Sequence, residues 1–299
     1  MRTAWLPALG LFVLAPVCAE YLWGYDAWVG VDLNGCPCQR DPFHHARGDG
    51  SDMGELLVPR RFCGPPSTGN GGWTAGALAA LVVPIGGDEP WPAIAVSLRT
   101  PPPLDTPMPI ATRDGVTEAV HGEQVVALAE VRDGDLPVVE PVSAEEARAA
   151  EASYAGHAFH PFPTCFACGV GRAPGDGLRI FPGQVSDDRD GATRTAATWT
   201  PDASVEEADG RASLPVTWAA LDCVGGWAGD LEERLMVLAT MTACVDTLPV
   251  VGEEHVVVGR ARGRDGRKTW TASTLYDSDG RVVARAEHLW VAVHPAAFA

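Results

Sequence analysis

The chain has 299 residues, of which 46% are hydrophobic and 20% charged, a composition typical of a folded globular protein. Its 39 acidic and 22 basic residues give a formal net charge of −17, which would repel a phosphate backbone at long range and argues against nucleic acid as a partner. A few local cations could still bind a small polyphosphate. Eight cysteines are too sparse for a disulfide scaffold, so mostly reduced thiols are expected.

The first 52 residues form a leader with two interpretations. Residues 1–19 combine one Arg, an apolar run and a weak small-residue cleavage site, as in a signal peptide. The run is short and interrupted by prolines, so no stable membrane insertion is expected. Either the protein is exported, or the leader is an over-extended start. Residues 20–52 lack a sustained period, which favours the second interpretation and a cytoplasmic protein.

Residues 53–140 are predicted to form the first of two similar units. The helix in this unit lacks a polar face, and its strands show period-2 character with polar turns between them. In chain order the expected elements are a short extended piece (LLVPRRF, 56–62), a turn cluster (GPPSTGNGG, 64–72), a buried helix over 73–83, and strands over 93–100, 108–115 and 123–131.

Residues 141–164 are predicted to form a proline-bounded linker that contains a short helix, in which Ser143 and Glu146 fit a capping box. The second unit repeats the order of the first at greater length. Its expected elements are a strand over 192–200, an apolar helix over 214–229, and strands over 236–245, 253–262, 268–277 and 281–293. One helix followed by antiparallel strands, found twice, predicts an α+β fold in which each sheet wraps a central helix.

Three motifs carry a resemblance to a known family. They are NGGWTAGALAA (70–80), CFACGVGRAPGDGLRIFPG (165–183) and WAALDCVGGWA (218–228). In this order they resemble the hotdog-fold acyl-CoA thioesterases of the phenylacetate-pathway type, in the tandem double-hotdog form, over about residues 55–293. The resemblance implies an N-terminal hotdog over 53–140 and a C-terminal hotdog over 165–299. It also implies hydrolysis of acyl-CoA, with CoA as part of the substrate and no separate cofactor, and a possible homo-oligomer.

Asp222 is the candidate catalytic residue, because it lies near the middle of an otherwise apolar helix. Burial of a carboxylate raises its pKa toward neutrality, which suits a general base or a nucleophile. In thioester hydrolysis it could deprotonate water or attack the carbonyl carbon itself. The alternative is a structural role, in which Asp222 caps a frayed helix start or accepts a hydrogen bond from a backbone amide.

Asn70, Gly71 and Gly72 are the candidate site for the carbonyl oxygen. Glycines ahead of a helix present free N–H groups at the positive end of its dipole, and Asn70 could hold the loop or donate directly. The alternative is a plain N-cap with glycines for the turn. The first helix lacks a carboxylate and the second unit lacks an Asn-Gly-Gly loop, so the sequence predicts one composite site between the units and a degenerate twin.

CoA would need cations near the mouth of the site. The candidates are Arg60, Arg61, Arg172, Arg179, Arg267 and Lys268, although most exposed cations only solvate a surface. The main rival to the enzyme is a non-catalytic protein that binds acyl-CoA or a lipid between the helices.

No metal site is expected, but two groups have ligand types that bind zinc. His157, His160, Cys165 and Cys168 have the spacing H-x2-H-x4-C-x2-C, which is not a standard zinc-finger pattern. The second group, in the leader, is Cys36, Cys38, His44 and His45. Cys223, beside Asp222, is expected to be a small buried thiol rather than a nucleophile.

Overall fold

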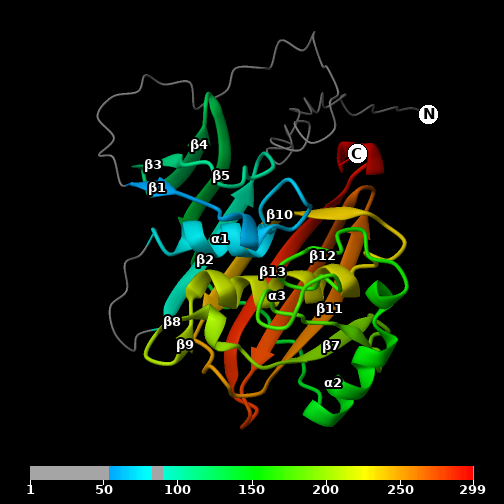
Figure 1. The fold of residues 1–299 in the computed structure, drawn as a ribbon. Coiled ribbons are helices and arrows are strands. Elements are labelled where there is room, and N and C mark those ends of the chain that lie inside the picture. Colours follow the sequence, from blue (N-terminus) through cyan, green and yellow to red (C-terminus); the bar gives the residue numbers. More distant parts are fainter. Residues whose placement is uncertain (1–53, 83–89, 299) are drawn as a thin grey trace, which may run out of the picture.

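The computed structural model describes residues 54–82 and 90–298 (Figure 1). The leader, with its targeting and metal-binding interpretations, lies outside the described residues. Among the helices that are described, none combines the length and the apolar character that a membrane span requires.

One antiparallel sheet runs through the described part of the chain, in the order β1-β3-β4-β5-β2-β10-β13-β12-β11-β7-β6. Strands of the two halves meet where β2 pairs with β10, with Met241 opposite Val96. The strands of this sheet are β1 (Glu55–Leu56), β2 (Trp91–Leu98), β3 (Met108–Arg113), β4 (Val116–His121), β5 (Gln124–Val131), β6 (Gly183–Val185), β7 (Arg194–Trp199), β10 (Met236–Val245), β11 (His255–Asp265), β12 (Lys268–Tyr276) and β13 (Val282–Ala292). A separate ribbon pairs β8 (Glu206–Ala208) with β9 (Arg211–Ala212).

Two main helices lie on the same face of the sheet, and Figure 1 shows them side by side at its middle. They are α1 (Gly71–Ala79) and α3 (Leu214–Ala228), while α2 (Ala144–Ala150) lies beyond β7. Short 3-10 turns complete the fold: η2 (Arg60–Phe62), η3 (Glu151–Ser153), η4 (Ala155–His157), η5 (Ala203–Val205) and η6 (Pro295–Phe298).

The two halves of the chain have the same connectivity. In the first half α1 is followed by β2, β3, β4 and β5, which lie in the order β2-β5-β4-β3 away from the centre. In the second half α3 is followed by β10, β11, β12 and β13, which lie in the order β10-β13-β12-β11. The repeated helix-then-strands order that the sequence predicted is therefore present, within one continuous sheet.

The sequence-based prediction missed β4. The predicted strand over 108–115 runs past the end of β3, because Asp114 and Gly115 have φ values of 50° and 80° and reverse the chain. The segment from Val116 to His121 then pairs with both β3 and β5. This segment is short and lies between turns at Gly115 and Gly122, so the sequence pattern indicated a loop rather than a strand. The short strands β6, β8 and β9 were also not predicted.

The helix boundaries follow from their caps. Asn70 accepts a hydrogen bond from the Trp73 N–H and begins α1 two residues earlier than predicted, and the helix ends at Ala79 rather than continuing toward residue 83. Ser143 caps α2 by accepting from the Glu146 N–H at 3.1 Å, as the capping pattern predicted.

Close approach of α1 to α3 depends on two glycines one turn apart. A Cβ atom on Gly76 would lie 2.7 Å from the Cβ of Trp218 and 2.8 Å from the Cα of Pro215, distances at which real atoms overlap. A Cβ on Gly72 would lie 2.5 Å from the Cβ of Asp222. Since Gly72 meets Asp222 and Gly76 meets Trp218, the two helices run antiparallel. The missing side chains of α1 thus make room for α3.

The opposite side of α3 lies directly on the sheet. Cβ atoms on Gly225 and Gly226 would lie within 3.0 Å of His288 Nδ1 and the Trp290 ring respectively. Hydroxyls of the strands reach the helix carbonyls, and Ser273 Oγ donates to Leu221 O at 2.9 Å. Contact with α1 on one side and the sheet on the other explains why α3 needs no polar face.

His288 is buried beneath α3 without a full set of hydrogen bonds. Its Nδ1 lies 3.1 Å from Thr271 Oγ1, and its Nε2 has no partner in the described part of the chain. Burial lowers the pKa of His288 to about 3, because the surroundings cannot solvate the imidazolium. The folded protein therefore keeps this ring neutral.

Replacing Gly76 with Ala is expected to lower the free energy of unfolding by about 1–3 kcal/mol, because the added methyl group forces α1 away from Trp218. Gly263→Ala is the matched control, since a Cβ on exposed Gly263 meets nothing within 4 Å, and its effect should stay within about 0.5 kcal/mol. Chemical denaturation measures both. Equal free energies of unfolding for the two variants would contradict the close contact between α1 and α3.

Replacing His288 with Asn is expected to flatten the pH dependence of stability in acid. Below about pH 6.5 the unfolded chain protonates this ring and the folded chain does not, so the native protein loses about 1.4 kcal/mol for each unit of pH down to about 3. Above pH 6.5 the contribution is fully present. Denaturation of wild type and variant from pH 7 to pH 4 measures the slope, with exposed His121→Asn as the control that should leave it unchanged.

Candidate functional site

The buried carboxylate of Asp222 joins the two helices. Its Oδ2 accepts one hydrogen bond from Asn70 Nδ2 at 3.0 Å and a second from the Gly72 N–H at 2.9 Å. Asp222 is 2% exposed, and its Oδ1 has no partner among the described residues. The structure therefore brings the predicted carboxylate of the second half to the predicted Asn-Gly-Gly loop of the first.

The surroundings of Asp222 favour its neutral form. Burial raises the pKa of this carboxyl to about 7, against the opposing effect of the Gly72 N–H, which stabilises the anion. A negative charge on Cys165 raises the pKa of Asp222 further, and the Asn70 amide lowers it. Oδ2 is held in place by two hydrogen bonds, while Oδ1 has no partner among the described residues. The alternative structural role, a hydrogen bond from a backbone amide, therefore accounts for only one of the two oxygens.

Asn70 uses every polar group of its side chain. Its Oδ1 accepts from the Trp73 N–H, which caps α1, and its Nδ2 donates to Asp222 and lies 3.7 Å from Cys165 Sγ. The cap orients the amide so that Nδ2 must face α3. The predicted cap and the contact with Asp222 are thus features of the same side chain.

The three residues of the predicted carbonyl-oxygen site differ in their hydrogen-bond acceptors. Asn70 Nδ2 and the Gly72 N–H are directed at Asp222. The Gly71 N–H, at the first position of α1, has no hydrogen-bond partner in the described ranges, and Gly71 lines the pocket. Gly71 is therefore the donor that remains for a bound oxygen.

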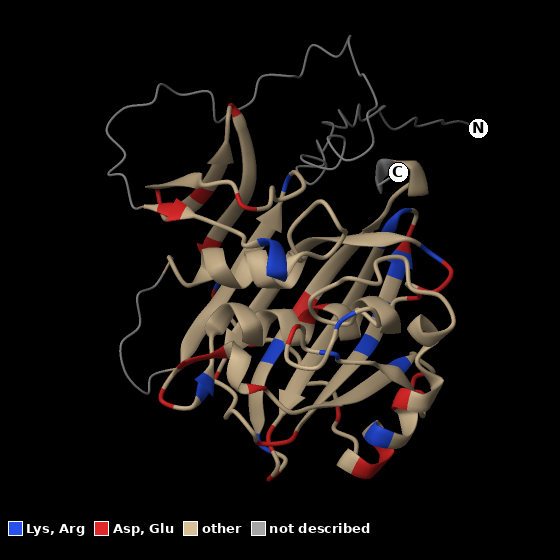
Figure 2. Cartoon of the chain, viewed as in Figure 1, with Lys and Arg blue, Asp and Glu red and all other residues tan. Residues whose placement is uncertain are grey.

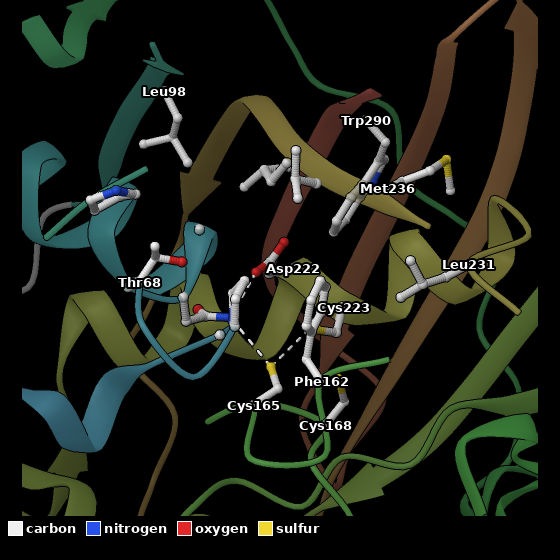
Figure 3. Close-up of a pocket in the computed structure, with 18 of the residues that line it drawn as sticks. Thr68, Leu98, Phe162, Cys165, Cys168, Asp222, Cys223, Leu231, Met236 and Trp290 are labelled. Atoms are coloured by element: carbon white, nitrogen blue, oxygen red, sulfur yellow. Dashed lines mark hydrogen bonds between the residues drawn. The ribbon is translucent and has the colours of Figure 1, made fainter. Parts of the chain in front are cut away.

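A small cavity of about 60 Å³ adjoins Asp222. Asn70, Gly71 and Asp222 line it together with apolar side chains, and Figure 3 shows Leu98, Met236 and Trp290 on the side of Asp222 that faces away from Cys165. A carboxylate, a free N–H group and an apolar wall therefore face the same space.

None of the six predicted CoA-binding cations lines this cavity. Arg61 and Arg172 donate to backbone carbonyls, including Ser204 O and Thr164 O, and so support loops. Arg179 donates to Arg172 O and lies over Phe181.

The other three are nearer the surface. Arg60 is exposed and pairs with Asp105 at 3.0 Å. Arg267 is exposed at the turn before β12, and Lys268 lines a different groove together with Trp270. Figure 2 shows Lys and Arg dispersed over several elements of the described chain.

A cluster of thiols lies beside Asp222 and lines the same cavity. The Sγ atoms of Cys165, Cys168 and Cys223 all lie within 4.8 Å of one another, and Nε2 of His160 lies 3.3 Å from Cys168 Sγ. His157, which the sequence grouped with them, is exposed. The sequence grouping therefore does not match the observed cluster in one member. Cys223 takes that place, and no local spacing could reveal it because it comes from α3, 55 residues beyond Cys168.

Comparison with known proteins addresses the fold. No family model matches this sequence, and no curated protein matches it. Among solved structures, the tesB protein of Mycobacterium avium subspecies paratuberculosis is similar over 82% of this chain and 96% of that chain, with a TM-score of 0.54 and 10% identity. A protein of unknown function with a hot dog fold from Alicyclobacillus acidocaldarius is similar over 81% of this chain and 93% of that one, with a TM-score of 0.52 and 16% identity. The chain has the hotdog fold.

The hotdog fold that the motifs predicted is thus confirmed over most of the described chain. Within this hotdog protein, the central helix α3 carries Asp222 and the start of α1 carries its partners. The candidate site lies where the two helices cross.

Replacing Asn70 with Ala is expected to lower the free energy of unfolding by about 2–4 kcal/mol. The variant loses a helix cap, worth about 1 kcal/mol, and leaves the buried Asp222 carboxylate short of a donor, which costs about 1–3 kcal/mol more. Ser143→Ala is the matched control, because it removes only the cap of α2. Similar losses in thermal or chemical denaturation would show that Asn70 acts as a cap alone.

Proposed function

We propose that this protein hydrolyses acyl-CoA thioesters, with Asp222 as the catalytic residue. The observation that carries the proposal is the split environment of its carboxylate. Oδ2 is fixed by Asn70 and Gly72, while Oδ1 is buried, has no partner among the described residues, and belongs to a side chain that lines an apolar cavity. A purely structural carboxylate would be expected to satisfy both oxygens.

We further propose that the chain is a tandem double hotdog, with repeats over 53–140 and 165–299. The repeated strand order supports this duplication. Counted from the N-caps, Ala79 of the first helix stands at the position that Asp222 has in the second, so only the second half supplies a carboxylate (222 − 213 = 79 − 70 = 9). One composite site would thus be active.

The opposite end of the helix pair, where the twin site would lie, lacks the same groups. Counted from the N-caps, Leu214 and Pro215 stand where the first half has Gly71 and Gly72. Proline has no N–H to donate, and Ala79 has no carboxylate. This end of the pair would accordingly be the degenerate twin of the proposed site.

The proposed reaction needs one nucleophile and one oxygen site. A thioester carbonyl placed in the cavity would accept a hydrogen bond from the Gly71 N–H, at the positive end of the α1 dipole. Asp222 Oδ1 would either remove a proton from an attacking water or attack the carbonyl carbon to form an anhydride that water then opens. Both routes consume one water and release the carboxylic acid and the thiol of CoA.

The CoA moiety would lie outside the cavity, which is too small for it. Arg60 is the cation best placed to meet a phosphate, because its side chain is exposed and it comes shortly before Gly64 and Pro65, which line the cavity. Arg61, Arg172 and Arg179 would support the loops around it. An acyl-CoA substrate also favours a cytoplasmic protein over an exported one.

Replacing Asp222 with Asn is expected to lower kcat for acyl-CoA hydrolysis by about 100-fold or more, because a carboxamide neither accepts the proton nor attacks the carbonyl. The fold should persist, since the amide oxygen can still accept from Gly72. A thiol-detecting assay over a panel of acyl-CoA chain lengths measures the rate, and circular dichroism checks the fold.

Asp230→Asn is the control for this experiment, because Asp230 follows the same helix but is exposed. It should leave the rate unchanged. Unchanged turnover in Asp222→Asn would rule out the catalytic assignment. A wild-type protein that binds acyl-CoA without turning it over would instead support the non-catalytic binding function.

A further inference from the structure

A cluster of three buried cysteines has no role in the proposed hydrolysis. Cys165 and Cys168 come from the loop before β6, and Cys223 comes from α3. The three thiols are free and are at most 7% exposed. Residues from distant parts of the chain therefore direct three soft ligand atoms at one point.

The spacing of the sulfur atoms suits a metal ion. Cys165 Sγ and Cys223 Sγ are 3.7 Å apart, and all three sulfurs lie within 4.8 Å of one another. Zinc–thiolate bonds of about 2.3 Å at tetrahedral angles place two sulfurs about 3.8 Å apart. Only small shifts would bring the three sulfurs onto one zinc ion.

The loop that carries two of the ligands is held in shape before any metal binds. A Cβ on Gly169 would lie 2.5 Å from Cys165 O, so the turn after Cys168 requires glycine. The Phe166 N–H donates to Cys63 O at 2.8 Å, and Tyr154 Oη donates to Cys168 O at 3.1 Å. These bonds fix the Cys-x2-Cys turn against Cys63 and Tyr154, so little ordering is left for a ligand to impose.

His160 contacts the cluster as a donor rather than as a fourth ligand. Its Nδ1 accepts from the Phe162 N–H at 3.0 Å, which leaves the ring proton on Nε2, 3.3 Å from Cys168 Sγ. Binding of a metal through Nε2 would require moving that proton to Nδ1, against the Phe162 N–H. A second donor, Asn70 Nδ2, lies 3.7 Å from Cys165 Sγ.

We propose that Cys165, Cys168 and Cys223 bind one Zn²⁺ ion as thiolates, with His160 and Asn70 donating hydrogen bonds to the sulfurs. One zinc ion and three thiols give the complex and three protons. The complex carries one net negative charge, which the two N–H donors help to stabilise in the buried site. All three cysteines also line the cavity beside Asp222, so the fourth position faces the cavity, as in zinc sites that keep an open position.

The test is a metal titration of the full-length chain, reduced and stripped with a chelator. Co²⁺ is the probe, because thiolate-to-cobalt charge transfer reports sulfur ligands directly and Zn²⁺ should abolish the band by displacement. One equivalent per chain is expected, together with a rise in Tm when Zn²⁺ is added. Absence of the charge-transfer band in the wild type overturns the proposal, whatever the variants do.

Variants locate the site. Cys165→Ser, Cys168→Ser and Cys223→Ser should each weaken Co²⁺ binding by more than about 100-fold, whereas His160→Ala should weaken it about 10–100-fold and keep the stoichiometry. Cys244→Ser, a half-buried free thiol outside the cluster, and the double variant Cys36→Ser/Cys38→Ser in the leader should bind as the wild type does. Loss of the band in the leader variant, or its survival in all three cluster variants, overturns the proposal. These readouts do not depend on hydrolysis.

Discussion

The close contact between α1 and α3 is the constraint on which the site depends. Without side chains at Gly72 and Gly76, the backbone of α1 comes near enough to α3 for the Gly72 N–H to reach Asp222 at 2.9 Å. A wider spacing would leave this carboxylate buried without a donor, which is costly in a protein interior. The glycines therefore determine both the packing of the two helices and the surroundings of the carboxylate.

Asn70 connects this packing to the chemistry of the cavity. Its amide caps α1, donates to Asp222 and approaches Cys165, which in turn lies 3.7 Å from Cys223 on α3. A carboxylate that could act on a thioester and thiols that could hold a metal are thus neighbours through one side chain. A substitution at Asn70 would therefore change the surroundings of both Asp222 and Cys165.

The two halves share a strand order but differ in chemistry. The first half contributes the N–H groups of Gly71 and Gly72 and a cap, and the second contributes the carboxylate and the three clustered thiols. Counted from the N-caps, the positions that correspond to Gly72 and Asp222 hold Pro215, which has no N–H to donate, and Ala79, which has no carboxylate. The proposed site therefore draws its groups from both halves.

The sequence by itself determined the helix-and-strands order and the capped start of α2, and it singled out Asp222, Asn70, Gly71 and Gly72 as candidates. These features depend on local patterns: apolar runs, turn residues, caps and a lone carboxylate in an apolar helix. The tertiary structure decided what the Asn70 and Gly72 donors face, which cations stay away from the cavity, and that Cys223 rather than His157 joins Cys165 and Cys168. Such pairings depend on how α3 packs against segments that lie about 50 to 150 residues away in the sequence. A local sequence pattern carries no information about contacts between segments so far apart.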